Sequence, residues 1–158
     1  ANARAVQQGF LTSDPYAIEQ AADFDPRVFL LADEGYPSYG AVVLAPNAFA
    51  RDNAAALRSF IAASAEGWRD YIRGDASAGD ALIRRDNPDM TQARLDQARE
   101  RLRDGGVVDG GDAALYGLGA LTAERWQAFF EAMSKAGVYD AGLNWRDAFT
   151  DNYLPGRG

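Results

Sequence analysis

Three short apolar segments lie within the first 45 residues of the chain, and no further segment of this kind follows them. They span residues 6–11, 27–32 and 41–45. The second and third are continuous apolar runs, which are typical of strands buried on both faces of a parallel sheet. Three such strands are too few to bury one another. The pattern therefore predicts an α/β fold whose sheet is completed by other polypeptide, such as a missing N-terminal part of the chain or a second copy.

The remainder of the sequence has the periodicity of helices. A long helix is expected after Asn53, because apolar residues recur at three- and four-residue steps up to Ile72 and Gly74 can end it. Further helices are expected over residues 76–85, from 89 to about 103 and over 122–136, and residues 144–153 are expected to form a last helical turn or two. About five helices thus follow the few short strands.

Two absences limit the chemistry that this chain can perform. It contains no histidine and no cysteine, which excludes within these residues a Ser-His-Asp triad, a cysteine nucleophile and zinc sites built on such ligands. The aspartates of residues 104–112 lack the alternating spacing of an EF-hand, so no calcium site is expected. The net charge of −7 disfavours nucleic acid, whose phosphates need a basic surface. Carboxylate chemistry and plain binding remain, and we expect binding, with no catalytic residue, metal or cofactor.

The stretch from Gln7 to Tyr16 is the strongest candidate for a ligand site. The predicted strand stops at Thr12-Ser13-Asp14, whose side chains can cap a helix, and Pro15 suits the first helical turn. A strand that ends at a helix N-terminus leaves backbone N–H groups and polar side chains pointing one way, as small polar ligands require. The alternative interpretation is an ordinary capped turn.

Four segments occur in a characteristic order: QQGFLTSDPY (7–16), LADEGYPSY (31–39), LRSF through GWRDY (57–71) and DNP (86–88). Through them the chain resembles, over nearly its whole length, the substrate-binding proteins of ABC transporters. The most similar branch handles thiamine-pyrimidine precursors, with nitrate, sulfonate, taurine and riboflavin binders as relatives.

The resemblance implies the C-terminal portion of a two-lobe, type II periplasmic-binding-protein fold. Residues 1–34 would end the second lobe, residues 35–45 would form the hinge crossing and a strand, and residues 46–158 would be a helical part packing on the first lobe. The implied function is the solute-binding component of an importer for a small organic molecule, a pyrimidine precursor or a related heteroaromatic. Such a protein is periplasmic, binds by lobe closure without catalysis and delivers its ligand to a membrane permease.

The expected ligand-binding residues combine hydrogen-bonding groups with flat rings. They are Gln8, Thr12, Ser13, Asp14, Tyr16, Tyr36 and Tyr39. Asp14 is the sharpest of these predictions: its carboxylate could accept a hydrogen bond from a ring amino group, or it could cap the helix. Tyr36 and Tyr39 could instead serve in packing at the hinge.

Two other functions remain open from the sequence. Pyrimidine-precursor synthases share the implied fold, and such an enzyme would need reactive groups in the missing half. The third hypothesis is a stand-alone helical domain with an interaction role.

Overall fold

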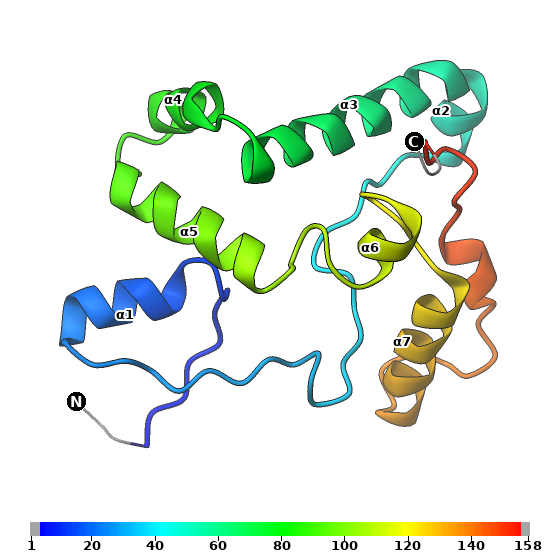
Figure 1. The fold of residues 1–158 in the computed structure, drawn as a ribbon. Helices are drawn as coiled ribbons and strands as arrows, with labels where there is room; N and C mark the ends of the chain where they lie inside the picture. Colours follow the sequence, from blue (N-terminus) through cyan, green and yellow to red (C-terminus); the bar gives the residue numbers. More distant parts are fainter. Residues whose placement is uncertain (1–3, 156–158) are drawn as a thin grey trace. The chain divides into compact units, whose positions relative to one another are not determined.

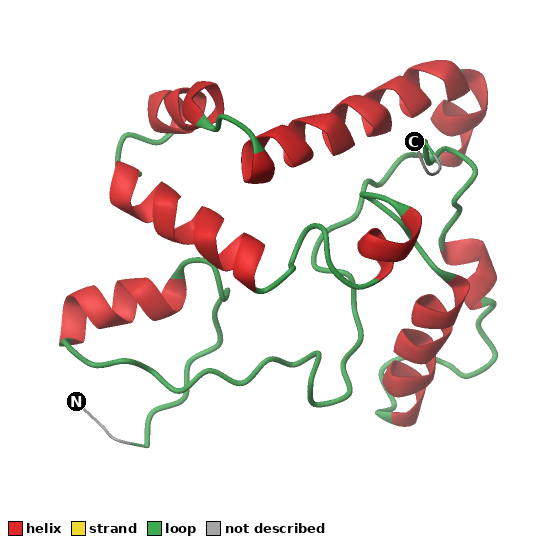
Figure 2. Ribbon diagram, in the orientation of Figure 1, coloured by secondary structure: helices red, strands yellow, loops and turns green. Residues whose placement is uncertain are grey.

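The computed structural model describes residues 4–155, and this part of the chain is helical with no strand (Figures 1 and 2). It forms, in chain order, α1 (Asp14–Ala22), α2 (Asn47–Asp52), α3 (Ala54–Arg73), α4 (Ser77–Asp86), α5 (Gln92–Asp104), α6 (Asp112–Tyr116), α7 (Ala123–Lys135) and the 3-10 helix η1 (Trp145–Ala148). Of the helices that residues 4–155 form, none has the length and apolar character needed to cross a membrane.

The predicted α/β fold with a few short strands is wrong. Residues 6–10, 25–30 and 41–46 have no regular secondary structure, and residues 11–13 and 31–35 form turns. A strand is stabilised by the strands beside it, and the described chain brings none to these segments. Their composition is that of buried strands, yet their side chains are exposed: Phe29 is 65% exposed and Leu44 is 93% exposed.

The main helices lie close to where their sequence signals predict them. Pro15 occupies the first turn of α1, and Gly74 follows α3 directly. The Thr91 hydroxyl accepts a hydrogen bond from the Arg94 amide, and the Thr122 hydroxyl accepts one from the Arg125 amide, which caps α5 and α7. The short helices α2 and α6 were not predicted from the sequence, and the last helical turn expected within residues 144–153 is the four-residue η1.

The chain divides into two compact units that are each discontinuous in sequence. The first joins the residues up to Val28 to Asp70–Val108, and the second joins Phe29–Arg69 to the residues from Asp109 onward. The first unit therefore contains α1, the end of α3, α4 and α5. The second contains α2, most of α3, α6, α7 and η1.

The core of the first unit is small and lies among the end of α3, α4 and α5. Ile72 is 1% exposed, Leu95 is 2% exposed, and Ala76 is also buried. Gly105, just after α5, lies beside the turn that precedes α1, since a Cβ built on it would stand 3.6 Å from the Leu11 Cδ2 atom. The turn before α1 and the end of α5 are therefore neighbours within the first unit.

The second unit is held largely by aromatic packing around α7 and η1. The Phe149 ring stacks on two tryptophan rings. Its centroid lies 5.3 Å from that of Trp126 and 6.2 Å from that of Trp145. Tyr36 meets the Phe129 ring edge to face at 5.3 Å. Offset-stacked and edge-to-face pairs of this kind add about 0.5–1.5 kcal/mol to the burial of the rings.

Truncation of Ile72 tests the core of the first unit. Ile72→Ala should lower the free energy of unfolding by about 2–4 kcal/mol, because it leaves a cavity in a closely packed site. Urea unfolding followed by circular dichroism measures the change. Val6→Ala is the control, because Val6 is 97% exposed and its truncation should cost less than about 0.5 kcal/mol. Equal effects of the two substitutions would contradict the described core.

Candidate functional site

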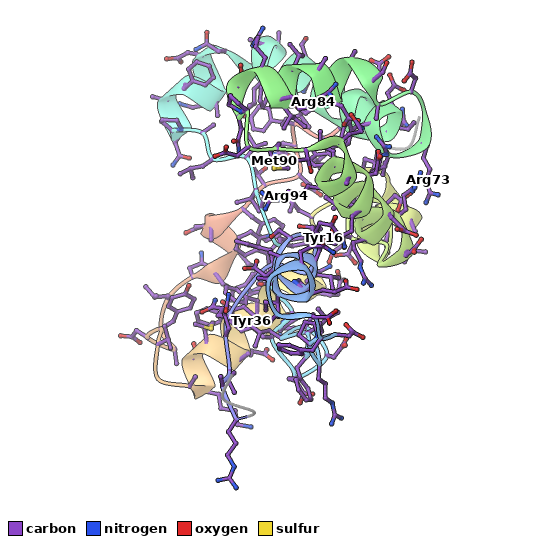
Figure 3. The ribbon with its side chains drawn as sticks, turned by 90° about the vertical axis from the view of Figure 1, so that its left-hand side faces the viewer. Tyr16, Tyr36, Arg73, Arg84, Met90 and Arg94 are labelled. Atoms are coloured by element: carbon purple, nitrogen blue, oxygen red, sulfur yellow. The ribbon has the colours of Figure 1, made fainter. Side chains whose placement is uncertain are left out.

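The structure places the predicted ligand-binding residues in both units. Gln8, Thr12, Ser13, Asp14 and Tyr16 lie in the first unit, at the turn before α1 and in its first turn, and Figure 3 labels Tyr16 there. The other two, Tyr36 and Tyr39, lie in the second unit.

The Asp14 carboxylate folds back over the residues that precede α1. Its Oδ2 atom accepts a hydrogen bond of 2.7 Å from the Phe10 amide and one of 3.0 Å from the Ser13 hydroxyl. The Phe10 amide and then the Ser13 hydroxyl lower the pKa of Asp14 below its ordinary value. The carboxylate is consequently ionised near neutral pH and held in one orientation at the surface.

Gly9 allows this close approach. A Cβ at position 9 would lie 2.6 Å from the Asp14 Cγ atom, which is shorter than any real contact between such atoms. The sequence analysis expected Gly9 to admit a ligand or another backbone, and the group that comes close is the Asp14 side chain. Asp14 thus fixes the turn through the Phe10 amide at its start.

The Tyr39 hydroxyl is engaged within the second unit. It donates a hydrogen bond of 2.7 Å to the Asp112 Oδ2 atom and accepts one of 2.8 Å from the Thr122 amide. The Arg125 guanidinium lies over the Tyr39 ring at 4.4 Å and donates to the carbonyl oxygens of Pro37 and Ser38. Burial, followed by the interaction with Asp112, raises the pKa of Tyr39.

Tyr36 and Tyr39 are therefore packing residues of the second unit in this structure. Tyr39 joins residues 37–39 to α6 and α7, and Tyr36 packs on Phe129 of α7 while 37% of its surface remains exposed. This arrangement agrees with the alternative that the sequence left open, in which these tyrosines serve in packing. A ligand could reach Tyr36 without breaking a hydrogen bond of the Tyr39 network.

The first unit contains a buried charge that the sequence analysis missed. Asp80 of α4 is 3% exposed and is the buried charged residue of the described chain. Its Oδ1 atom accepts a hydrogen bond of 2.9 Å from the Tyr71 hydroxyl. Its Oδ2 atom accepts one of 2.7 Å from the side-chain amide of Gln92. Arg99 of α5 completes the shell, with Nη1 at 3.3 Å from Oδ2.

Opposing effects act on the ionisation of Asp80. Burial on its own would raise the pKa of this carboxyl, whereas the hydrogen bonds from Gln92 and Tyr71 and the positive charge of Arg99 lower it. The net effect is a pKa below the ordinary value, so the carboxylate stays charged at neutral pH. The same arrangement, through burial and then through Asp80, raises the pKa of Tyr71 to about 12.

The spacing of α4 contained a signal for Asp80. Ala76, Asp80 and Ile83 recur at four and three residues and thus share one helical face, so an inward aspartate could have been inferred. Gly79 is part of the same fit, because a Cβ there would approach the Tyr71 ring to 2.9 Å. The partners Gln92 and Arg99 have no such signal, since only the packing of α5 brings them to α4.

Comparisons with protein-family models, with curated proteins and with solved structures give no match to this chain. Within residues 4–155 no three histidine, cysteine, aspartate or glutamate side chains are grouped as metal ligands would be. The site is therefore interpreted from its own geometry.

Removal of the buried carboxylate should destabilise the first unit in a pH-dependent way. Asp80→Ala is expected to lower the free energy of unfolding by about 3 kcal/mol at pH 7, because Arg99 is left without its buried partner. The folded pKa of Asp80 is depressed, so its contribution is present above the unfolded value near 3.9 and is lost as the pH falls through the folded pKa. The gap between wild type and variant should therefore narrow below about pH 4.

Urea unfolding across this pH range measures the gap. Asp86→Ala is the matched control, because Asp86 pairs with Arg85 at 2.8 Å while both side chains are largely exposed. Such a surface pair contributes about 1 kcal/mol or less. A gap for Asp80→Ala that does not change with pH would contradict the assigned charge state.

The raised pKa of Tyr71 predicts a second pH dependence of the stability, at alkaline pH. Its folded pKa is about 12, and the unfolded value is about 10. The contribution of the neutral phenol is thus present below about pH 10 and is lost as the pH rises through the folded value. The wild-type free energy of unfolding should consequently fall more steeply with pH above about pH 10 than that of Tyr71→Phe. Parallel slopes in urea unfolding would contradict the assignment.

Proposed function

We propose that this chain is part of a solute-binding component of an importer for a small heteroaromatic molecule, and that it binds without catalysis. The observation that carries the proposal is the turn before α1, where the ionised Asp14 carboxylate is held by Phe10 and Ser13. The ordered resemblance of residues 7–16, 31–39, 57–71 and 86–88 to substrate-binding proteins supports the same function. Delivery to a membrane permease in the periplasm belongs to this proposal.

The chemistry of the turn suits an aminopyrimidine. A ring amino group donates hydrogen bonds, and a carboxylate can accept them. Because this carboxylate is already held in one orientation, it loses little conformational entropy when the ligand binds. Phe10 beside it is 77% exposed and offers a flat apolar face, with Gln8 and Thr12 as further hydrogen-bonding groups. No His or Cys is present to act on the bound molecule.

The proposal includes a second polypeptide, either a missing N-terminal half or another copy of the chain. Two segments support it, since residues 28–31 and residues 42–44 each expose consecutive apolar side chains. Val42 and Val43 are 52% and 55% exposed, and Phe29 and Leu44 are more exposed still. Runs of exposed apolar side chains of this kind are unusual on a monomer and favour a surface that a partner covers.

A stand-alone helical interaction domain is the second candidate. The observation that favours it is the absence of any strand in residues 4–155. This candidate predicts the same exposed apolar segments but assigns no ligand to the Asp14 turn. The calorimetric test below separates the two functions.

Neutralisation of Asp14 tests the proposed ligand contact. Calorimetric titration of the chain with the hydroxymethyl-aminopyrimidine precursor of thiamine should show saturable binding, and Asp14→Asn should weaken it by about ten-fold or more, because a charge-assisted hydrogen bond is lost.

Asp23→Asn is the matched control for charge. Asp23 lies at the other end of α1 with a φ of 53°, a left-handed conformation that asparagine also adopts readily. This variant should bind like the wild type. Absence of binding by the wild-type chain, or equal binding by Asp14→Asn, would contradict the proposal and favour the interaction domain.

A further inference from the structure

A cavity of about 430 Å³ lies next to Asp80 in the first unit. Its wall combines the residues that lead into α4 with side chains of α4 and α5, among them Asp75, Arg84, Arg99 and Arg103. Arg84 is labelled on α4 in Figure 3. The wall is thus mostly charged, and three of its side chains are arginines.

The acidic groups of this cavity are already paired inside the protein. Asp80 is bound by Tyr71, Gln92 and Arg99, as described above. The Asp75 carboxylate accepts a hydrogen bond of 2.9 Å from the Ser77 amide, and this bond together with the Ser77 hydroxyl lowers its pKa. Neither carboxylate needs a cation from outside.

Arg99 is likewise occupied. Its Nη1 atom lies 3.3 Å from Asp80, and its Nη2 atom lies 2.7 Å from the Asp96 carboxylate. Its guanidinium also stands 5.9 Å from the centre of the Tyr71 ring. Arg99 therefore uses both of its terminal nitrogens to hold Asp80 and Asp96.

The other two arginines are different. Arg84 uses only Nε, at 3.4 Å from the Asp80 carbonyl oxygen, and Arg103 has neither an ion pair nor a hydrogen bond within residues 4–155. Both side chains therefore still have N–H groups that can donate hydrogen bonds to a ligand. Guanidinium groups present paired donors that match the oxygens of a phosphate.

We propose that this cavity binds the phosphate group of a small molecule through Arg84 and Arg103. The volume exceeds that of the phosphate group alone and leaves room for the rest of a small phosphomonoester. A nucleic acid or an anionic membrane is disfavoured as the source, because the chain carries a net charge of −7. The site is separate from the Asp14 turn and does not rest on the proposed importer function.

Titration of the full chain with phosphate tests the site. We would follow backbone amide chemical shifts at constant ionic strength, first with inorganic phosphate and then with a sugar phosphate. Saturable shifts confined to α4, the residues that lead into it and the end of α5 are expected. Tighter binding of the sugar phosphate identifies a phosphomonoester as ligand, and equal binding identifies inorganic phosphate, both of which support the site.

Charge-matched variants separate the site from the general field of the protein. Arg103→Gln and Arg84→Gln should each weaken binding by about ten-fold. Arg101→Gln is the control, because Arg101 lies on the same helix and does not line the cavity, and it should change the affinity by less than about two-fold. Non-saturable shifts in the wild type, or an equal effect of Arg101→Gln, would overturn the proposal.

Discussion

The buried Asp80 carboxylate is the interaction on which the first unit depends. A charge that is 3% exposed is tolerated only when its hydrogen bonds are complete, and here three side chains supply them. Tyr71 comes from α3, whereas Gln92 and Arg99 come from α5. One carboxylate on α4 thereby connects three helices.

This constraint explains why a unit with few buried apolar residues has a defined arrangement. Ile72 and Leu95 are among the few fully buried side chains of the unit, and they alone would specify the register of the helices poorly. The hydrogen bonds to Asp80 form only when α3, α4 and α5 meet at particular residues. The same contact engages Arg99 in the wall of the adjacent cavity, where Arg84 and Arg103 are the donors proposed to meet a ligand.

Local sequence signals predicted the helices, but they could not show which segments pack against one another. Thr91, Thr122, Pro15 and Gly74 mark helix ends through contacts with residues a few positions away, so the sequence alone was sufficient. The strands over residues 27–32 and 41–45 were wrong because a strand requires neighbours that are distant in sequence, and no periodicity reveals whether the chain contains them.

The candidate site shows the same division. The Asp14 turn is local, so its polar residues could be singled out from the sequence, although the hydrogen bond to the Phe10 amide could not be foreseen. The roles of Tyr39 and Asp80 depend on partners that lie 73 and 19 residues away, Asp112 and Arg99, and these needed the structure. Asp80 itself had a signal in its spacing with Ala76 and Ile83.

The ionisation of Asp80 in the folded chain is the property on which the arrangement of the first unit depends most. A carbon-13 NMR titration of the aspartate carboxyl groups, assigned by comparison with Asp80→Asn, reports this pKa without reference to stability. The account predicts a midpoint below the ordinary value of about 3.9 for an aspartate. A midpoint at or above that value would show that burial outweighs the hydrogen bonds and Arg99, and would contradict the central role assigned to this carboxylate.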